Sequence, residues 1–142
     1  MTHNRSVLIL GDIFALGLVT IIGFAMHGET DLSFLPRVAA TFFPLLIGWF
    51  LLAPRLGLFQ DEVIHHARQL WRPALTALFA APLAAVLRGL MLNAPIIPIF
   101  AVVLGVTSAL GMFVWRMIWY WITKRISPTE ITKTTRHNVR RF

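Results

Sequence analysis

The sequence contains no cysteine, which excludes disulfide bonds, thiolate metal sites and thiol nucleophiles. It is also poor in charge, since only 13% of its 142 residues are charged, against roughly 25% in a soluble domain. The hydrophobic share of 57% is therefore more than one soluble core would explain. This composition predicts an integral membrane protein, and the length allows one compact unit without a separate soluble domain.

Motifs that carry catalysis or hold cofactors are missing as well. No P-loop, HExxH, GxGxxG or nucleophile-elbow motif occurs in a suitable context. A basic stripe with interleaved stacking aromatics, which would indicate nucleic-acid binding, does not occur outside the apolar segments. We therefore expect no catalytic residue, no metal site, no cofactor and no nucleic-acid partner, and we attribute the net charge of +7 to membrane topology.

Long apolar runs dominate what is present. A helix needs roughly 20 residues to cross a bilayer, and among these runs only that at residues 38–53 is short for a span. The fold class predicted is an all-α membrane protein with four transmembrane helices. These helices are expected at about residues 7–26, 38–53, 73–92 and 96–122. Together they form a four-helix transmembrane domain over residues 1–122.

Two prolines and one long connection modify this plan. Pro44 and Pro82 lie inside the second and third expected helices, so both helices should be kinked. Asn93 to Pro95 predicts a tight turn. In residues 54–72, apolar and charged side chains recur at helical spacing on different faces, which predicts a short amphipathic helix at the membrane surface.

Lys and Arg outside the apolar runs are distributed unevenly. Ten of them fall on one side of the expected helices, and only Arg37 falls on the other. The positive-inside rule then predicts a multi-pass protein of the cell (plasma) membrane with both termini in the cytoplasm. Residues 123–142 would be a basic cytoplasmic tail, which could hold anionic lipid, dock on a partner or only anchor the topology. Its basic residues are Lys124, Arg125, Lys133, Arg136, Arg140 and Arg141.

Two charged residues inside the expected helices should meet. At about 1.5 Å of rise per residue, Asp12 and Arg116 both lie toward the cytoplasmic leaflet, and each shares a helix face with small residues. An intramembrane ion pair between them is predicted. It could be a structural pair that fixes helix register, which we favour because a permanent Arg charge keeps a carboxylate ionised, or it could be a proton or ion relay.

Arg88 and His27 belong to the opposite leaflet. Arg88 should pair with the outer-loop acids Glu29 and Asp31, although it could also bind an anion or a lipid headgroup. His27 could ligate a metal, haem or pigment, but a single His at a helix end is more often an interface residue. At the other end of the fourth helix, an aromatic cluster at residues 115–121 should mark the membrane boundary.

Several segments resemble a known family when they are taken in order. They are Asp12 with Phe14, Gly23 with His27-Gly28, Phe43-Pro44-Leu45-Leu46-Ile47-Gly48-Trp49, Leu87-Arg88-Gly89-Leu90 and Trp115-Arg116. The set is similar to a family of small four-helix membrane proteins known as domain of unknown function 3054. The resemblance implies the four-helix fold and supports the choice of Asp12, His27, Arg88 and Arg116, but it implies no activity. Phe24 departs from the basic residue expected after the glycine.

Three functions are compatible with these features. The first is a non-enzymatic accessory or structural subunit of a larger membrane protein complex, which the small size and the missing motifs favour. The second is a transporter or channel for a small solute, ion or proton that acts as an oligomer, because kinked helices and intramembrane charges occur in such proteins. The third is an intramembrane enzyme or pigment-binding protein that uses Asp12 or His27. The expected partners are the lipid bilayer and either other membrane subunits or further copies of the chain.

Overall fold

The computed structural model describes residues 2–139, with side chains described for residues 5–126. Within this range the elements are helices and turns, without a strand. The four long helices are α1 (Thr2–Met26), α2 (Leu35–Leu52), α4 (Trp71–Leu92) and α5 (Pro98–Val139). The short elements are η1 (Leu32–Phe34), α3 (Asp61–Ile64) and η2 (Ala67–Gln69). All four long helices contain a segment that is long and apolar enough to span a membrane.

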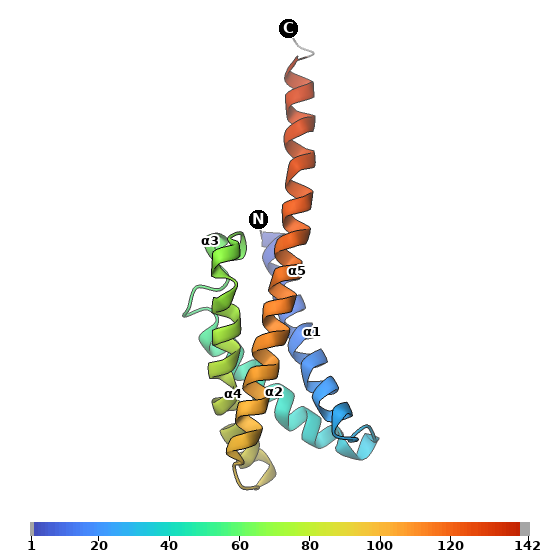
Figure 1. Cartoon of the computed structure of the whole chain (residues 1–142), viewed down its shortest axis with the longest axis vertical. Helices are drawn as coiled ribbons and strands as arrows, with labels where there is room; N and C mark the ends of the chain where they lie inside the picture. Colours follow the sequence, from blue (N-terminus) through green and yellow to red (C-terminus); the bar gives the residue numbers. More distant parts are fainter. Residues whose placement is uncertain (1, 140–142) are drawn as a thin grey trace.

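The long helices alternate in direction, so the connections fall at two ends (Figure 1). The start of α1 and the segment with α3 lie at one end, and the two short loops before α2 and before α5 lie at the other. Helix α5 packs against both α1 and α4, and α2 packs against α1 and α4. Beyond the bundle, α5 continues well past the end that carries α3 (Figure 1).

Small residues allow the helices to approach closely. Ala77, Ala80, Ala81, Ala84 and Ala85 of α4 are all buried. They face α2 at Gly48, where a Cβ would lie 3.0 Å from the carbonyl oxygen of Ala80, and α5 at Gly105, where a Cβ would lie 3.3 Å from the Cβ of Ala81. Close backbone packing of this kind is what drives helix association when no water surrounds the helices.

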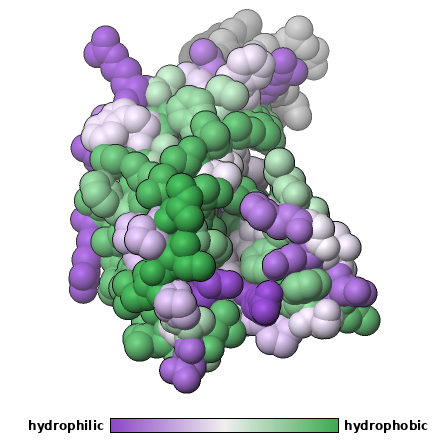
Figure 2. All heavy atoms as spheres, turned by 60° about the horizontal axis from the view of Figure 1, so that its bottom comes forward, coloured by the Kyte–Doolittle hydropathy of each residue, from purple (hydrophilic) through white to green (hydrophobic). Residues whose placement is uncertain are grey.

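The outward surface of the helices is apolar. Figure 2 shows a broad green surface with hydrophilic side chains gathered at its margins. Large side chains such as Phe14 (70% exposed) and Trp121 (60% exposed) point outward from the bundle. A soluble protein would bury such groups, so the chain is built as a multi-pass membrane protein.

Two predictions about the helices are wrong. The expected continuous amphipathic helix over residues 54–72 is replaced by turns, the four-residue α3 and η2. The chain reverses at Gly57, which has a left-handed φ of +67°, and so turns Leu58, Val63 and Ile64 into buried positions. The last helix does not end near residue 122 but continues to Val139. No glycine lies between Ile122 and Val139, and each added residue except Pro128, which lacks a backbone N–H, can donate one further backbone hydrogen bond.

Candidate functional site

The centre of the site is a buried ion pair between α1 and α5. The Nη2 of Arg116 donates to the Oδ2 of Asp12 at 2.7 Å, and its Nε donates to Oδ1 at 3.1 Å. The Asp12 side chain is 0% exposed and the Arg116 side chain 3%. The two residues that the sequence places at the same depth are therefore in contact, in the two-pronged geometry that suits a guanidinium and a carboxylate.

Further groups occupy the remaining hydrogen-bonding positions of the pair. The indole N–H of Trp115 donates to Asp12 Oδ1 at 3.0 Å. The Nη1 of Arg116 donates to the carbonyl oxygen of Leu58 at 3.2 Å, and the guanidinium carbon lies 5.7 Å from the centroid of the Phe59 ring. The pair is thus enclosed on the Asp side by a hydrogen-bond donor and on the Arg side by an acceptor, which offsets the free energy of burying both charges.

A second indole faces the same carboxylate from α2. Trp49 is fully buried, and its N–H approaches Asp12 without reaching hydrogen-bond geometry. Residues of α1, α2, α5 and the loop after α2 therefore surround one ion pair. The ion pair therefore links α1 and α5, the first and the last long helix in the sequence.

A glycine makes room for this arrangement. Gly11 precedes Asp12, and a Cβ at Gly11 would overlap the ring of Trp115. The absence of a side chain at this position lets α5 approach α1 closely enough for Trp115 and Arg116 to reach the carboxylate.

The second intramembrane cation, Arg88 of α4, has different partners from those predicted. Its Nε donates to the Oγ1 of Thr41 on α2 at 3.0 Å, and its guanidinium carbon lies 4.5 Å from the centroid of the Phe100 ring on α5. Among the residues with described side chains, Arg88 forms no ion pair. The Oε1 of Glu29 lies instead 3.7 Å from the Nη1 of Arg37. The predicted pairing of Arg88 with the outer-loop acids is therefore wrong, because a hydroxyl and an aromatic ring lie closer to it within the bundle.

A family comparison covers most of this architecture. A model of one protein family matches residues 9–119, a range that includes α2, α4, most of α1, the first half of α5 and both intramembrane arginines. The chain belongs to the DUF3054 family. Its members are described as proteins of unknown function. No curated protein and no solved structure matches this DUF3054 chain significantly. The family match thus assigns no activity, which has to be argued from the site.

His27 lies apart from the charged residues of the DUF3054 bundle. It is exposed after the end of α1, and its Nδ1 lies 2.8 Å from the carbonyl oxygen of Gly23, as expected when Nδ1–H donates. No group of three or more metal-ligating side chains occurs among the described residues. The local contact of His27 is that of a side chain closing the last turn of its own helix.

The basic tail is described only in part. Lys124 and Arg125 are exposed at the end of the span, and the Nζ of Lys124 lies 5.7 Å from the centroid of the Tyr120 ring. Lys133 and Arg136 belong to the α5 backbone, but their side chains lie outside the described set. Arg140 and Arg141 lie outside the described residues altogether.

Sequence reasoning missed three of the groups around the two arginines. Trp115 was assigned to an aromatic boundary cluster, yet it turns inward and packs on Trp119 with ring centroids 6.0 Å apart. The signal was its position beside Arg116, because two neighbouring donors can serve one carboxylate. The carbonyl of Leu58 and the hydroxyl of Thr41 left no signal, since a backbone group carries no sequence mark and a helical Thr usually bonds its own backbone.

Proposed function

We propose that this DUF3054 protein is a non-enzymatic accessory or structural subunit of a larger membrane protein complex. The observation that carries the proposal is the projection of α5 beyond the bundle (Figure 1). The apolar span of this helix reaches Ile126, the last residue whose side chain the structure describes, and the helix continues through the polar sequence from Ser127 to Val139. These 13 residues extend it by about 20 Å.

A helix of this length is marginal in water when nothing packs against it. In Figure 1 no other element of the chain runs beside the extension of α5. A partner that packs on the extension would stabilise it, and the positive side chains Lys124 and Arg125 at its base favour an acidic partner surface. On this proposal the plasma membrane is the site of the complex and both termini lie in the cytoplasm, in agreement with the distribution of Lys and Arg.

The buried pair has a structural role on this proposal. Asp12 accepts three hydrogen bonds from Arg116 and Trp115, so the carboxylate is held by donors on both oxygens. A group that carries a proton through a membrane must exchange partners, whereas a group that fixes two helices gains from keeping them. The pair would fix the position of α5 relative to α1 and so direct the extension.

The proposal is tested by purifying the tagged full chain from its native membranes in mild detergent. We expect other polypeptides at a fixed ratio to the full chain, and we expect this ratio to fall at least tenfold for a chain that ends at residue 126. The shortened chain must unfold at the same denaturant concentration as the full chain for the comparison to count. Recovery of the same partners at the same ratio with the shortened chain would overturn the role of the extension.

A transporter or channel is the second candidate, because two features favour it. Helices α2 and α4 contain the internal prolines Pro44 and Pro82, and the pair of Asp12 and Arg116 lies inside the spans. Proton and ion flux into liposomes, measured for the wild type and for Asp12→Asn, distinguishes the two candidates. Flux that the substitution abolishes would favour the transporter.

A further inference from the structure

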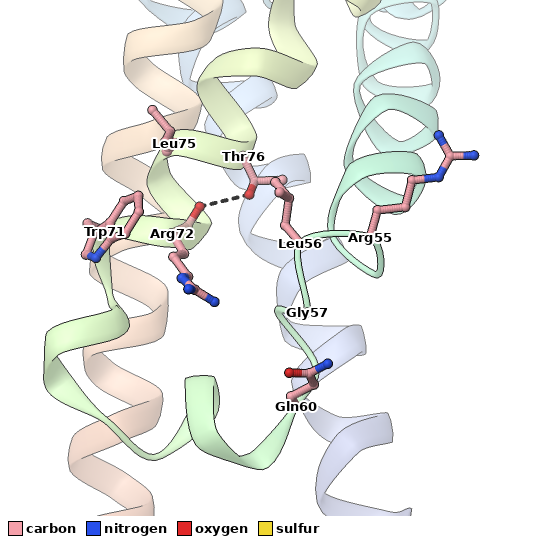
Figure 3. A pocket seen from close by; sticks show the side chains of 8 residues that line it. All are labelled: Arg55, Leu56, Gly57, Gln60, Trp71, Arg72, Leu75 and Thr76. Atoms are coloured by element: carbon pink, nitrogen blue, oxygen red, sulfur yellow. Dashed lines mark hydrogen bonds between the residues drawn. The ribbon is translucent and has the colours of Figure 1, made fainter.

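A hollow of about 420 Å³ lies beside the first turns of α4 and the loop that follows α2. Arg72 and Trp71 border it from α4, and Arg55 and Gln60 border it from the loop (Figure 3). The apolar side chains of Leu56 and Leu75 complete much of the lining. None of these residues takes part in the buried pair between α1 and α5, so the hollow, here named the Arg72 pocket, is a separate feature.

The Arg72 pocket holds positive charge that has no counter-charge among the side chains that the structure describes. Arg72 is half-buried, and in Figure 3 its side chain reaches into the space between α4 and the loop with Gly57 and Gln60. The guanidinium of Arg55 points away from that space in Figure 3 and is exposed at the rim. Within residues 5–126, neither guanidinium is recorded in an ion pair or a hydrogen bond.

The guanidinium of Arg72 lies near an aromatic ring and leaves its hydrogen-bond donors free. The guanidinium carbon of Arg72 lies 5.8 Å from the centroid of the Trp71 ring, and its backbone carbonyl accepts a hydrogen bond of 2.8 Å from Thr76. Helix α4 starts here without a side-chain cap and without an acidic residue in its first turn. The positive end of the helix dipole therefore adds to the positive potential of the two arginines.

The position of the pocket indicates the type of anion. It lies where the spans Leu32–Leu52 and Ala67–Leu92 meet their connection, at the bundle end that carries the start of α1. Trp71 is 55% exposed there, as is usual for an indole at the headgroup level of a bilayer. Phosphate is the anion found at that level, and an Arg guanidinium binds phosphate through two parallel hydrogen bonds.

We propose that the Arg72 pocket binds a phosphate group, with Arg72 as the principal ligand and Arg55 adding positive charge at the rim. An anionic phospholipid headgroup and a soluble phosphate share this chemistry. The exposed apolar side chains of Leu56 and Leu75 would contact the glycerol and acyl region of a lipid, which a soluble phosphate lacks. The site is independent of the subunit role proposed above, because it uses neither the extension of α5 nor the buried pair.

Native mass spectrometry of the full chain in detergent tests this site. The protein is titrated with dioleoylphosphatidylglycerol, with dioleoylphosphatidylcholine and with glycerol phosphate in separate series. We expect one molecule of the phosphatidylglycerol to bind at least tenfold more tightly than the phosphatidylcholine, whose choline cation opposes Arg72. Arg72→Gln should weaken that binding about tenfold, since a hydrogen-bonded pair with a charged group is lost.

Three further variants separate the pocket from the general charge of the surface. Arg55→Gln, at an exposed position, should weaken binding about threefold. Arg72→Lys keeps the charge but loses the two parallel hydrogen bonds, so it should weaken binding less than Arg72→Gln does. Arg68→Gln removes an equal charge from the exposed η2, outside the lining, and should change binding less than twofold.

Each outcome decides the proposal. Binding that depends on Arg72 and Arg55, but not on Arg68, supports it. Glycerol phosphate that binds with the same dependence supports the phosphate site and assigns it to a soluble ligand. Equal losses for Arg72→Gln and Arg68→Gln would reduce the effect to surface charge and overturn the site. Equal binding of both phospholipids, without binding of glycerol phosphate, would overturn it as well.

Discussion

Removing one member of the pair between Asp12 and Arg116 should destabilise the protein more than removing both. Asp12→Asn leaves Arg116 charged at a position that is 3% exposed. The guanidinium then keeps its hydrogen bond to the carbonyl oxygen of Leu58 but has no negative partner. Arg116→Gln leaves a fully buried carboxylate with only the Trp115 indole as a strong donor. Breaking a buried pair in this way costs about 3–5 kcal/mol in soluble proteins, whereas a single polar contact between membrane helices contributes about 0.6 kcal/mol on average.

The larger of these two values applies here, because each single substitution leaves a buried charge without its partner. We expect each single substitution to lower the free energy of unfolding by about 3 kcal/mol. The double change Asp12→Leu with Arg116→Met removes both charges and keeps apolar volume, so it should lower the free energy of unfolding by less than about 1 kcal/mol. Unfolding in mixed micelles with increasing dodecyl sulfate, followed by Trp fluorescence, measures all three values.

The surroundings of the pair add a second, sharper expectation. Exchange of the two residues by Asp12→Arg with Arg116→Asp would place a guanidinium against the Trp115 N–H and a carboxylate against the Leu58 carbonyl. Both contacts would be repulsive, so the exchange should recover less stability than the apolar double change. Single variants within about 0.5 kcal/mol of the wild type, or a double variant that loses the sum of the single losses, would refute the structural role.

Two other substitutions follow from the packing. Gly11→Ala should lower the free energy of unfolding by about 2 kcal/mol, because its Cβ would displace the Trp115 ring that bonds to Asp12. Gly23→Ala on the same helix, with no atom within 4 Å of its Cβ, should be neutral or slightly stabilising, and equal losses for both would contradict the tight α1–α5 contact. Thr41→Val should lower the free energy of unfolding by about 1 kcal/mol through the lost bond from Arg88; no change on unfolding in micelles would show that this bond contributes nothing.

The helices and one buried contact were predictable from the sequence. The helices follow from long apolar runs, and the contact follows from single charged residues inside those runs. Long apolar runs must be helical in a membrane, where backbone groups have no water to bond. Asp12 and Arg116 could be paired because helix direction and the rise per residue fix their depth, and a membrane offers an isolated charge few other partners.

The connection after α2 and the environment of Arg88 were not predictable, because tertiary contacts decided both. The helical pattern of residues 54–72 gave way to a reversal at Gly57, which buries Leu58 and lets its carbonyl meet Arg116. Arg88 found a hydroxyl and an aromatic ring in place of a carboxylate. Neither partner carries a charge, so a search for opposite charges could not find them.

The most direct test of the subunit proposal is the mass of the particle that contains the full chain after mild extraction from its native membranes. The proposal predicts one particle far heavier than the chain's own 16.0 kDa, with other polypeptides present at a fixed ratio. A particle whose mass is a small multiple of this chain, with lipid and detergent but no second polypeptide, would contradict it.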